Sequence, residues 1–140
     1  MQFSSRMTIA THILVCVAMF QDTHKVTSTF LASSIQVNPV IVRNVLGLLS
    51  AAGLVEVRAG VGGAKLAKPT EAITLRDVFK AVETEEALFH FHEAPNPQCP
   101  VGRNIHAVLD GRLAAIQAAM EQEMAGTTLA QLVEETQARA

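Results

Sequence analysis

The stretch that decides the fold runs from Val37 to Val57, VNPVIVRNVLGLLSAAGLVEV, and it opens on an asparagine followed by a proline. Asn38 can accept a hydrogen bond from the free N–H groups of a helix start, and Pro39 suits the first helical position. An apolar stripe at helical spacing follows, made of Val42, Val45, Leu46, Leu49 and Ala52. The residues facing away from it are Pro39, Val40, Arg43, Asn44, Gly47 and Ser50. The pattern predicts a helix with one buried face and one face free to contact a partner.

A short β-hairpin is predicted directly after this helix. Gly53 ends the helix, and residues 54 to 57 alternate as a strand does. Gly60 to Gly63 then give a tight connection to a second strand around Lys65 and Leu66. Together with a shorter helix upstream, this order indicates a winged helix-turn-helix, whose second helix enters a DNA major groove. We therefore expect a mainly α fold with a small β-wing.

The other elements before residue 90 are also predicted helices. Residues 6 to 20 are strongly apolar and should form a largely buried helix, and Ser28 can cap the next, shorter helix, which runs to about Ile35. Thr74 has an acid three residues on, the arrangement that opens a helix, and that helix should reach to near Glu85.

The C-terminal third is dominated by one long amphipathic helix. It follows a proline-rich loop at residues 87 to 102, begins at Asn104 and ends at Gly126, before a short last helix opened by Thr128. Its stripe consists of Ile105, Leu109, Leu113, Ile116, Met120 and Met124. A helix of about 20 residues is roughly 30 Å long, enough to extend beyond its own domain. We expect a second copy of the chain to cover the stripe in a homodimer, and the alternative is packing on its own chain only.

These elements predict a division of the chain into three parts. Residues 1–84 form a winged helix-turn-helix DNA-binding domain, residues 85–103 a sensing or linker loop, and residues 104–140 the dimerisation helix with the short C-terminal helix. A signal acting near the loop would change how the long helices set the distance between the two DNA-binding heads.

Charge is divided unevenly along the chain, although the net value is only −2. Residues 1–80 carry a net charge of +4 and residues 81–140 carry −6. Positive charge thus collects on the half that would neutralise DNA phosphates. The longest apolar run, residues 13 to 20, is too short to cross a bilayer, and two cysteines form no disulfide framework. A cytoplasmic protein without membrane contact is expected.

The candidate DNA-binding residues lie at helix starts, on the exposed face of the second helix and on the wing. They are Ser4, Arg6, Thr27, Ser28, Asn38, Pro39, Val40, Arg43, Arg58 and Lys65. Arg43 is the best candidate for reading a base, because a guanidinium can donate to both O6 and N7 of guanine. Hydroxyls and free N–H groups at helix starts suit phosphate oxygens. Each phosphate or wing candidate taken alone is more often a solvated surface residue. For Asn38 the alternative is a helix cap only, and for Val40 it is packing within the turn.

Cys99 is the most interesting residue outside the predicted DNA-binding part. A thiol between Gln98 and Pro100 in a loop can be oxidised or alkylated where its pKa is lowered, and His90 and His92 lie nearby in the sequence. A packing role for the thiol is the competing interpretation. The histidine spacing matches no standard metal-ligand pattern, so no metal is expected. No signature of an enzyme is present, because the chain has neither a phosphate-binding glycine loop nor a serine elbow.

Several segments in order resemble the Rrf2 family of bacterial transcription regulators over nearly the whole chain. They are Asn38-Pro39-Val40-Ile41-Val42-Arg43, Ala52-Gly53-Leu54-Val55, Gly60-Val61-Gly62-Gly63, Ile73-Thr74-Leu75-Arg76-Asp77-Val78 and Asn96-Pro97-Gln98-Cys99-Pro100-Val101-Gly102. The last segment looks like the YwnA-like branch, which lacks the iron–sulfur cysteines. The wing departs from the family, with Ala59 where relatives usually have glycine and Ala64 where they have a bulky residue.

The resemblance implies a dimeric winged-helix repressor with crossed long helices, acting on a near-palindromic operator. Cluster-binding members have three cysteines in the loop before the long helix, whereas this loop has only Cys99, so no cofactor is expected. Some relatives use a non-cysteine ligand from the first helix, and His12 lies in that helix. The effector would be an oxidant, an electrophile or a small ligand. Two alternatives stay open: a winged helix that binds a polypeptide, and a ligand or thiol sensor without DNA binding.

Overall fold

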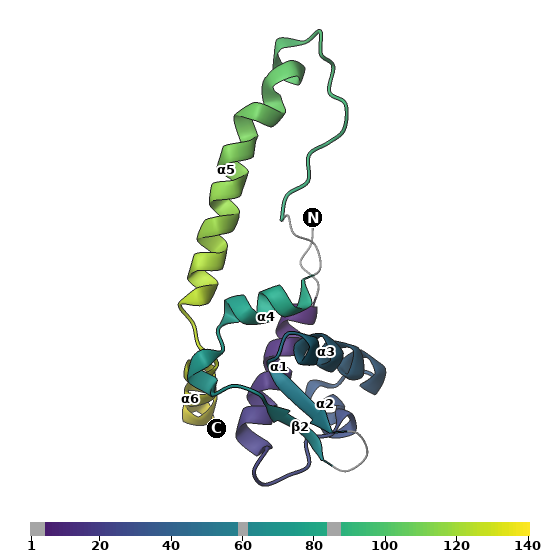
Figure 1. Ribbon diagram of the computed structural model, residues 1–140, viewed down its shortest axis with the longest axis vertical. Helices are drawn as coiled ribbons and strands as arrows, with labels where there is room; N and C mark the ends of the chain where they lie inside the picture. Colours follow the sequence, from purple (N-terminus) through teal and green to yellow (C-terminus); the bar gives the residue numbers. More distant parts are fainter. Residues whose placement is uncertain (1–4, 59–61, 84–87) are drawn as a thin grey trace.

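The computed structural model describes residues 5–58, 62–83 and 88–140, which are mainly helical with one two-stranded sheet (Figure 1). The elements are α1 (Arg6–Phe20), α2 (Ser28–Ile35), α3 (Pro39–Ala51), β1 (Val55–Arg58), β2 (Gly63–Leu66), the 3₁₀ turn η1 (Thr70–Ala72), α4 (Leu75–Val82), α5 (Pro100–Ala125) and α6 (Leu129–Arg139). The mainly α fold with a small β-wing is confirmed. Ser4, Ala59, residues 60–61 of the wing tip and Glu85 lie outside the described residues. Within the described ranges, no helix combines the length and the apolar character that crossing a membrane requires.

The start of α2 differs by one residue from the prediction. Thr27 is extended, and its side-chain oxygen accepts a hydrogen bond from the Phe30 N–H at 3.1 Å. Thr27 is therefore the cap, and Ser28, predicted in that role, is already the first helical residue. A cap must precede the helix so that its side chain can fold back onto the third helical N–H, and only Thr27 does so here. Gln36 ends α2 in the left-handed conformation, with φ of 65°.

Helix α3, the predicted recognition helix, begins as its sequence predicts. Asn38 Oδ1 accepts a hydrogen bond from the Val40 N–H at 2.8 Å, and Pro39 is the first helical residue. The buried residues of α3 are Val42, Val45, Leu46 and Leu49. Ala52, predicted to extend this stripe, is instead exposed, because α3 ends at Ala51. Gly53 then turns the chain with a φ of 76°, which suits a residue without a Cβ.

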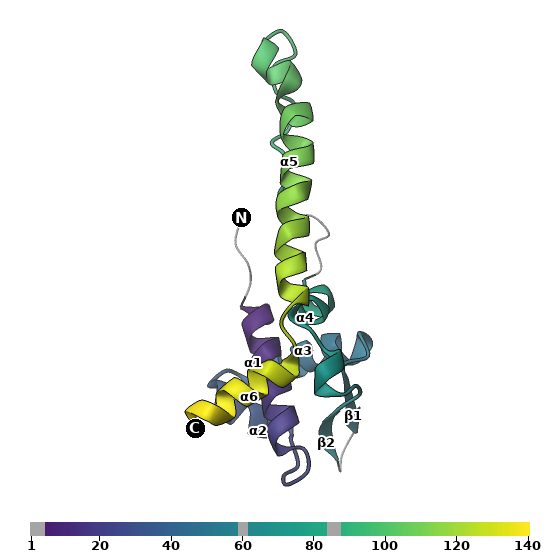
Figure 2. The same ribbon diagram turned by 90° about the vertical axis from the view of Figure 1, so that its left-hand side faces the viewer.

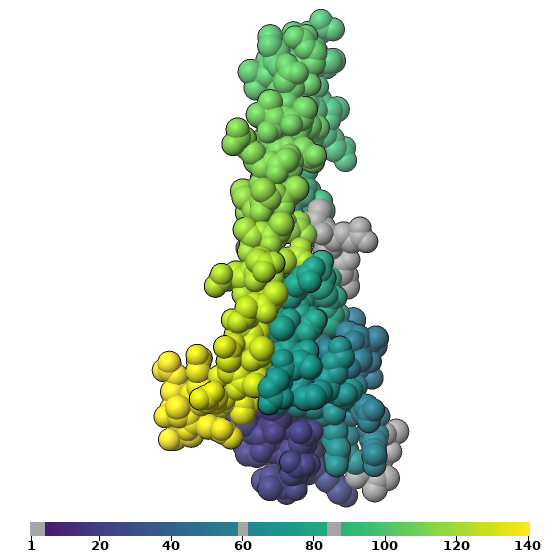
Figure 3. Space-filling view, turned by 60° about the vertical axis from the view of Figure 1, so that its left-hand side comes forward, coloured from purple at the N-terminus to yellow at the C-terminus, as the bar shows by residue number. Residues whose placement is uncertain are grey.

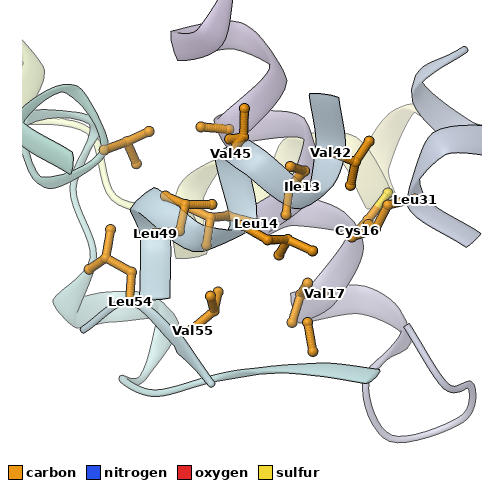
Figure 4. Close-up of a cluster of buried hydrophobic side chains, with 14 of the residues drawn as sticks. Ile13, Leu14, Cys16, Val17, Leu31, Val42, Val45, Leu49, Leu54 and Val55 are labelled. Atoms are coloured by element: carbon orange, nitrogen blue, oxygen red, sulfur yellow. The ribbon is translucent and has the colours of Figure 1, made fainter. Parts of the chain in front are cut away.

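A single apolar core holds α1, α2, α3 and the wing together (Figure 4). Helix α1 supplies Ile13, Leu14 and Val17, all fully buried, and the facing side chains come from α2, α3, β1 and the turn before β1. Those labelled partners are Leu31, Val42, Val45, Leu49, Leu54 and Val55. Full burial of one such side chain contributes about 1.5–3 kcal/mol. The core therefore fixes α3 by one face and leaves its opposite face outside.

Two hydrogen bonds tie the wing to the segment between α1 and α2. The Ala64 N–H donates to the Val26 carbonyl at 2.8 Å, and the Leu66 N–H donates to Gln21 Oε1 at 2.9 Å. Gly63 has a φ of 64°, and a Cβ there would lie 2.7 Å from the Val26 nitrogen. A glycine is thus required where the wing passes closest to the body of the domain.

Helix α5 projects away from the rest of the molecule (Figures 1 and 2). It begins at Pro100, four residues before the predicted start at Asn104, and has 26 residues. Proline suits the first helical position, so Pro100, taken as part of the loop, in fact opens the helix. At 1.5 Å per residue, α5 is about 39 Å long. None of its residues is buried.

Helices α4 and α6 join the base of α5 to the body. Both start with a predicted capping box, formed by Thr74 with Asp77 and by Thr128 with Gln131. On the α4 side, Lys80 Nζ lies 2.8 Å from Glu121 Oε1 of α5. Figure 3 shows α6 beside α1 and the C-terminal half of α5 beside α4. The far half of α5 therefore stands clear of its own globular part.

Candidate nucleic-acid interface

The outward face of α3 combines apolar and polar side chains at its N-terminal end. Val40 is 50% exposed and Ile41 is 43% exposed, although both are large apolar residues. Arg43 and Asn44 are exposed on the next turn. Because the opposite face is held in the core, these four side chains are presented to the outside on a rigid helix. Such a face can offer methyl groups, an amide and a guanidinium to base edges.

Arg43 bridges the two helices of the helix-turn-helix. Its Nη1 donates to Ser28 Oγ at 3.5 Å, which brings the guanidinium to the first turn of α2. The first N–H groups of a helix lack intrahelical partners and favour anions. Ser28, Arg43 and the start of α2 therefore form a compact polar site at the edge of the recognition face.

A groove of about 760 Å³ runs between α3, the start of α2 and the wing. Lys25, Arg43 and Arg58 are among its lining residues, and the described lining includes no carboxylate. The buried residues Val26, Leu46 and Ala64 form its apolar floor, and the exposed Val57 adds to its lining. Positive charge above an apolar floor suits a polyanion such as the sugar-phosphate strand of DNA.

The remaining predicted DNA contacts do not join this groove. Arg6 lies 3.8 Å from Glu83 in an ion pair, so part of its charge is already compensated. Lys65 is exposed on β2 opposite Glu56 of β1, and it is absent from the described groove lining. Thr27, Ser28, Arg43 and Arg58 are brought together in the described lining. Arg6, Lys65 and the residues at the start of α3, Asn38, Pro39 and Val40, are not part of it.

Three residues of this surface were missed from the sequence. Ile41 is exposed because it falls off the apolar stripe of α3, a spacing that could have identified it. Lys25 and Val57 line the groove from the loop before α2 and from β1. Their position depends on how the wing docks against Val26, which no local pattern encodes.

Cys99 lies at the start of α5, far from the recognition helix (Figure 1). The N–H groups of Gly102 and Val101 at this helix start lower the pKa of the Cys99 thiol from its ordinary value, although none of them completes a capping hydrogen bond to the sulfur. A lowered pKa raises the thiolate fraction at neutral pH and hence the reactivity.

The three histidines predicted near a sensing site are in different places. His92 packs edge-on against His106 of α5 with ring centres 5.1 Å apart, and His90 is exposed in the same loop. His12 instead lies on α1, where its Nε2 is 2.9 Å from Ser34 Oγ. The structure therefore leaves His92 near the start of α5 and assigns His12 to a separate cluster.

Comparisons with known proteins agree with this architecture. The family model for Rrf2, described as an iron-dependent transcriptional regulator, matches residues 3–135. An HTH-type transcriptional regulator of Bacillus subtilis (strain 168), YwnA, is 43% identical over 126 residues, which span 90% of this chain and 92% of that protein. A crystal structure described as a DNA-binding protein is 36% identical, with a TM-score of 0.73 over 91% of this chain and 98% of its own. CymR, the global cysteine regulator of B. subtilis, shares the fold at 20% identity, with a TM-score of 0.71 over 96% and 97%.

The iron dependence in that family description can be tested against the donor atoms of this chain. Across the described ranges, no group of three His, Cys, Asp or Glu side chains could hold a metal ion. The chain has two cysteines, of which Cys16 is buried in α1 and Cys99 is alone at the start of α5. The residues that the structure describes do not fit a resident iron centre.

Proposed function

The chain belongs to the Rrf2 family of DNA-binding transcriptional regulators, and on this premise we propose that it represses transcription as a homodimer on a near-palindromic operator. It is a regulator and not an enzyme. The observation that supports the proposal is that α3 has one buried face and one exposed face. Val42, Val45 and Leu49 are buried in the core, whereas Val40 and Arg43 are exposed to solvent. A rigid helix with such a face fits a major groove.

The proposed docking divides the contacts between bases and backbone. Pro39, Val40 and Ile41 enter the DNA major groove first and pack against thymine methyl groups, while Arg43 donates hydrogen bonds to guanine. Asn38 stays the cap of α3, close to the DNA surface. The DNA phosphates on the two sides of the major groove are contacted by Thr27, Ser28, Lys25 and Arg58. These residues supply hydroxyls, N–H groups of the helix start and positive charges.

The second copy is inferred from α5. Val101, Val108 and Ile116 are 67%, 59% and 51% exposed, and helical spacing places them on one side of α5 together with Ala115 and Ala119. The predicted stripe is only half covered by its own chain, since Leu113 and Met120 are half-buried. Pairing of two α5 helices removes the exposed side from water and places two recognition helices on one duplex. The boundaries 1–84, 85–103 and 104–140 belong to this proposal.

The proposed input is a covalent change at Cys99, by an oxidant or an electrophile. The thiol lies at the start of α5, where a lowered pKa favours the thiolate. Modification there would act on the pairing of the α5 helices and so on the distance between the DNA-binding heads. A difference of a few kcal/mol between the operator affinities of the modified and unmodified protein is enough to change operator occupancy.

The experiment that tests base reading starts from duplexes selected from a random pool by the full-length protein. Replacing one thymine at a time by uracil in the selected duplex removes a methyl group without changing hydrogen bonding. We expect affinity to fall at one or two positions of each half-site, and Val40→Ala protein to lose that sensitivity. Equal affinity for the thymine and uracil duplexes at every position would exclude methyl reading by the tip of α3.

A further inference from the structure

A second cavity, of about 380 Å³, lies between α1, α2 and α6 and shares no described lining residue with the DNA-facing groove. Val15, Met19 and Phe20 of α1 form an apolar wall, and Thr136 of α6 closes another side. Cavities for small organic ligands begin at about this size. The described lining contains no carboxylate, lysine or arginine, so a small uncharged ligand fits it better than a charged one.

The lining of this cavity includes the buried Cys16 and the exposed Ser34 and His12, which lie in contact and which we call the Cys16 cluster. Cys16 Sγ donates to Ser34 Oγ at 3.5 Å, and Ser34 Oγ lies 2.9 Å from His12 Nε2. In the tautomer of His12 whose Nε2 carries no proton, the Ser34 hydroxyl accepts from the thiol and donates to His12 Nε2. Cys16 is 6% exposed, and its sulfur lies at the edge of the labelled side chains in Figure 4.

We propose that the Cys16 cluster is a thiol addition site for small, uncharged α,β-unsaturated carbonyl compounds. A cysteine becomes a nucleophile when an adjacent base can take its proton, and the base need not touch the sulfur directly. Here the hydroxyl of Ser34 connects the thiol to the imidazole of His12. The cavity supplies an apolar surface that can bind the ligand. The site thus combines a ligand-binding cavity, a nucleophile in Cys16 and a proton acceptor in His12.

The reaction is an addition that needs no oxidant. The sulfur forms a bond to the β-carbon, and the electron pair of the C=C bond moves onto the carbonyl as an enolate. The thiol proton passes through Ser34 to His12, and the imidazolium returns a proton to the α-carbon. The product is a thioether at Cys16, and its atoms are those of the two reactants.

An adduct at this position affects the recognition helix through α2. Ser34 lies two residues before Gln36, where α2 ends and the turn to α3 begins. A guest bonded to Cys16 occupies the space beside Ser34 and breaks the contact between α1 and the end of α2. This route to DNA release is independent of Cys99, which lies at the opposite end of the molecule.

The test uses full-length Cys99→Ser protein, in which Cys16 is the remaining thiol. The probe is trans-2-hexenal, and intact mass followed over time gives the rate of adduct formation. Ser34→Ala and His12→Gln are compared with Ser33→Ala, a control on the same helix whose hydroxyl donates to the Phe30 carbonyl instead. Ser34→Thr restores the hydroxyl. The labelling rate does not depend on operator binding, so it stays informative if the proposed operator function fails.

We expect one adduct on Cys16 in native protein, with Ser34→Ala and His12→Gln at least about tenfold slower than Ser33→Ala and with Ser34→Thr close to the parent rate. A carboxylate-bearing maleimide should react more slowly at Cys16 than N-ethylmaleimide does. The proposal is overturned if Cys16 reacts only in denaturant, if all variants react at one rate, or if Ser34→Ala reacts faster because it uncovers the thiol.

Discussion

The guanidinium of Arg43 connects α3 to the start of α2, two parts of the proposed DNA-binding surface, through one hydrogen bond to Ser28. Its position on the outer face of α3 was predictable, because the apolar stripe of the same helix fixes which side is buried. Its contact with Ser28 was not, since the two residues are fifteen positions apart and meet only through the packing of α2 on α3.

Removing the Arg43 side chain should weaken operator binding by about 1–3 kcal/mol and relax the preference at one base pair. Fluorescence anisotropy with the selected duplex and its single-base variants measures both effects. Arg43→Lys should keep the salt dependence of binding and still lose the base preference, because an ammonium lacks the planar fork of donors. If Arg43→Ala keeps both affinity and selectivity, Arg43 has no role in reading the sequence.

Among the secondary-structure elements, the starts of helices are easier to predict from the sequence than the contacts between residues far apart in the chain. Asn38 and Pro39 determine the start of α3 locally, and the capping boxes of α4 and α6 could be read in the same way. Pro100 could have identified the start of α5, but a proline in a proline-rich segment also suits a loop. The anchoring of the wing on Val26 and Gln21 could not be predicted, because it joins residues up to 45 positions apart.

Two glycine substitutions test whether the wing depends on its docking contact. Gly63→Ala should destabilise the domain by 1 kcal/mol or more, since a Cβ would overlap the Val26 backbone at a positive φ. Gly47→Ala, in the middle of α3 with no heavy atom within 4 Å of the added Cβ, should stabilise it by about 0.5–1 kcal/mol. Thermal unfolding followed by circular dichroism separates the two. Similar shifts in both proteins would contradict the required close approach of the wing.

For the whole molecule, the sequence predicts amphipathic helices but not which apolar side chains stay uncovered. The loop at residues 88–99 returns along α5, where Phe91 packs on His106 with ring centres 4.5 Å apart. This contact and the salt bridge to Lys80 cover one side of α5 and leave Val108 and Ile116 outside. The surface proposed to pair with a second copy is therefore defined by tertiary packing rather than by the helical stripe alone.

A charge placed on the uncovered side of α5 should separate the subunits. Ile116→Glu is expected to convert the dimer to monomers and to cost at least about 2 kcal/mol of operator affinity, because a buried interface cannot hydrate the carboxylate. Ala114→Glu, exposed on the other side of α5 by helical spacing, is the matched control. Sedimentation velocity measures the assembly state. A monomeric parent protein would remove the basis of this prediction.

The most direct test of the account is the dependence of binding on the distance between half-sites. A rigid pair of α5 helices delivers two copies of α3 at one fixed separation and rotation, so inserting five base pairs between the selected half-sites turns the second half-site to the far face of the duplex. We predict that this insertion lowers the affinity of the dimer to that for a single half-site. Unchanged affinity for the inserted duplex would contradict the proposal that two recognition helices read one operator together.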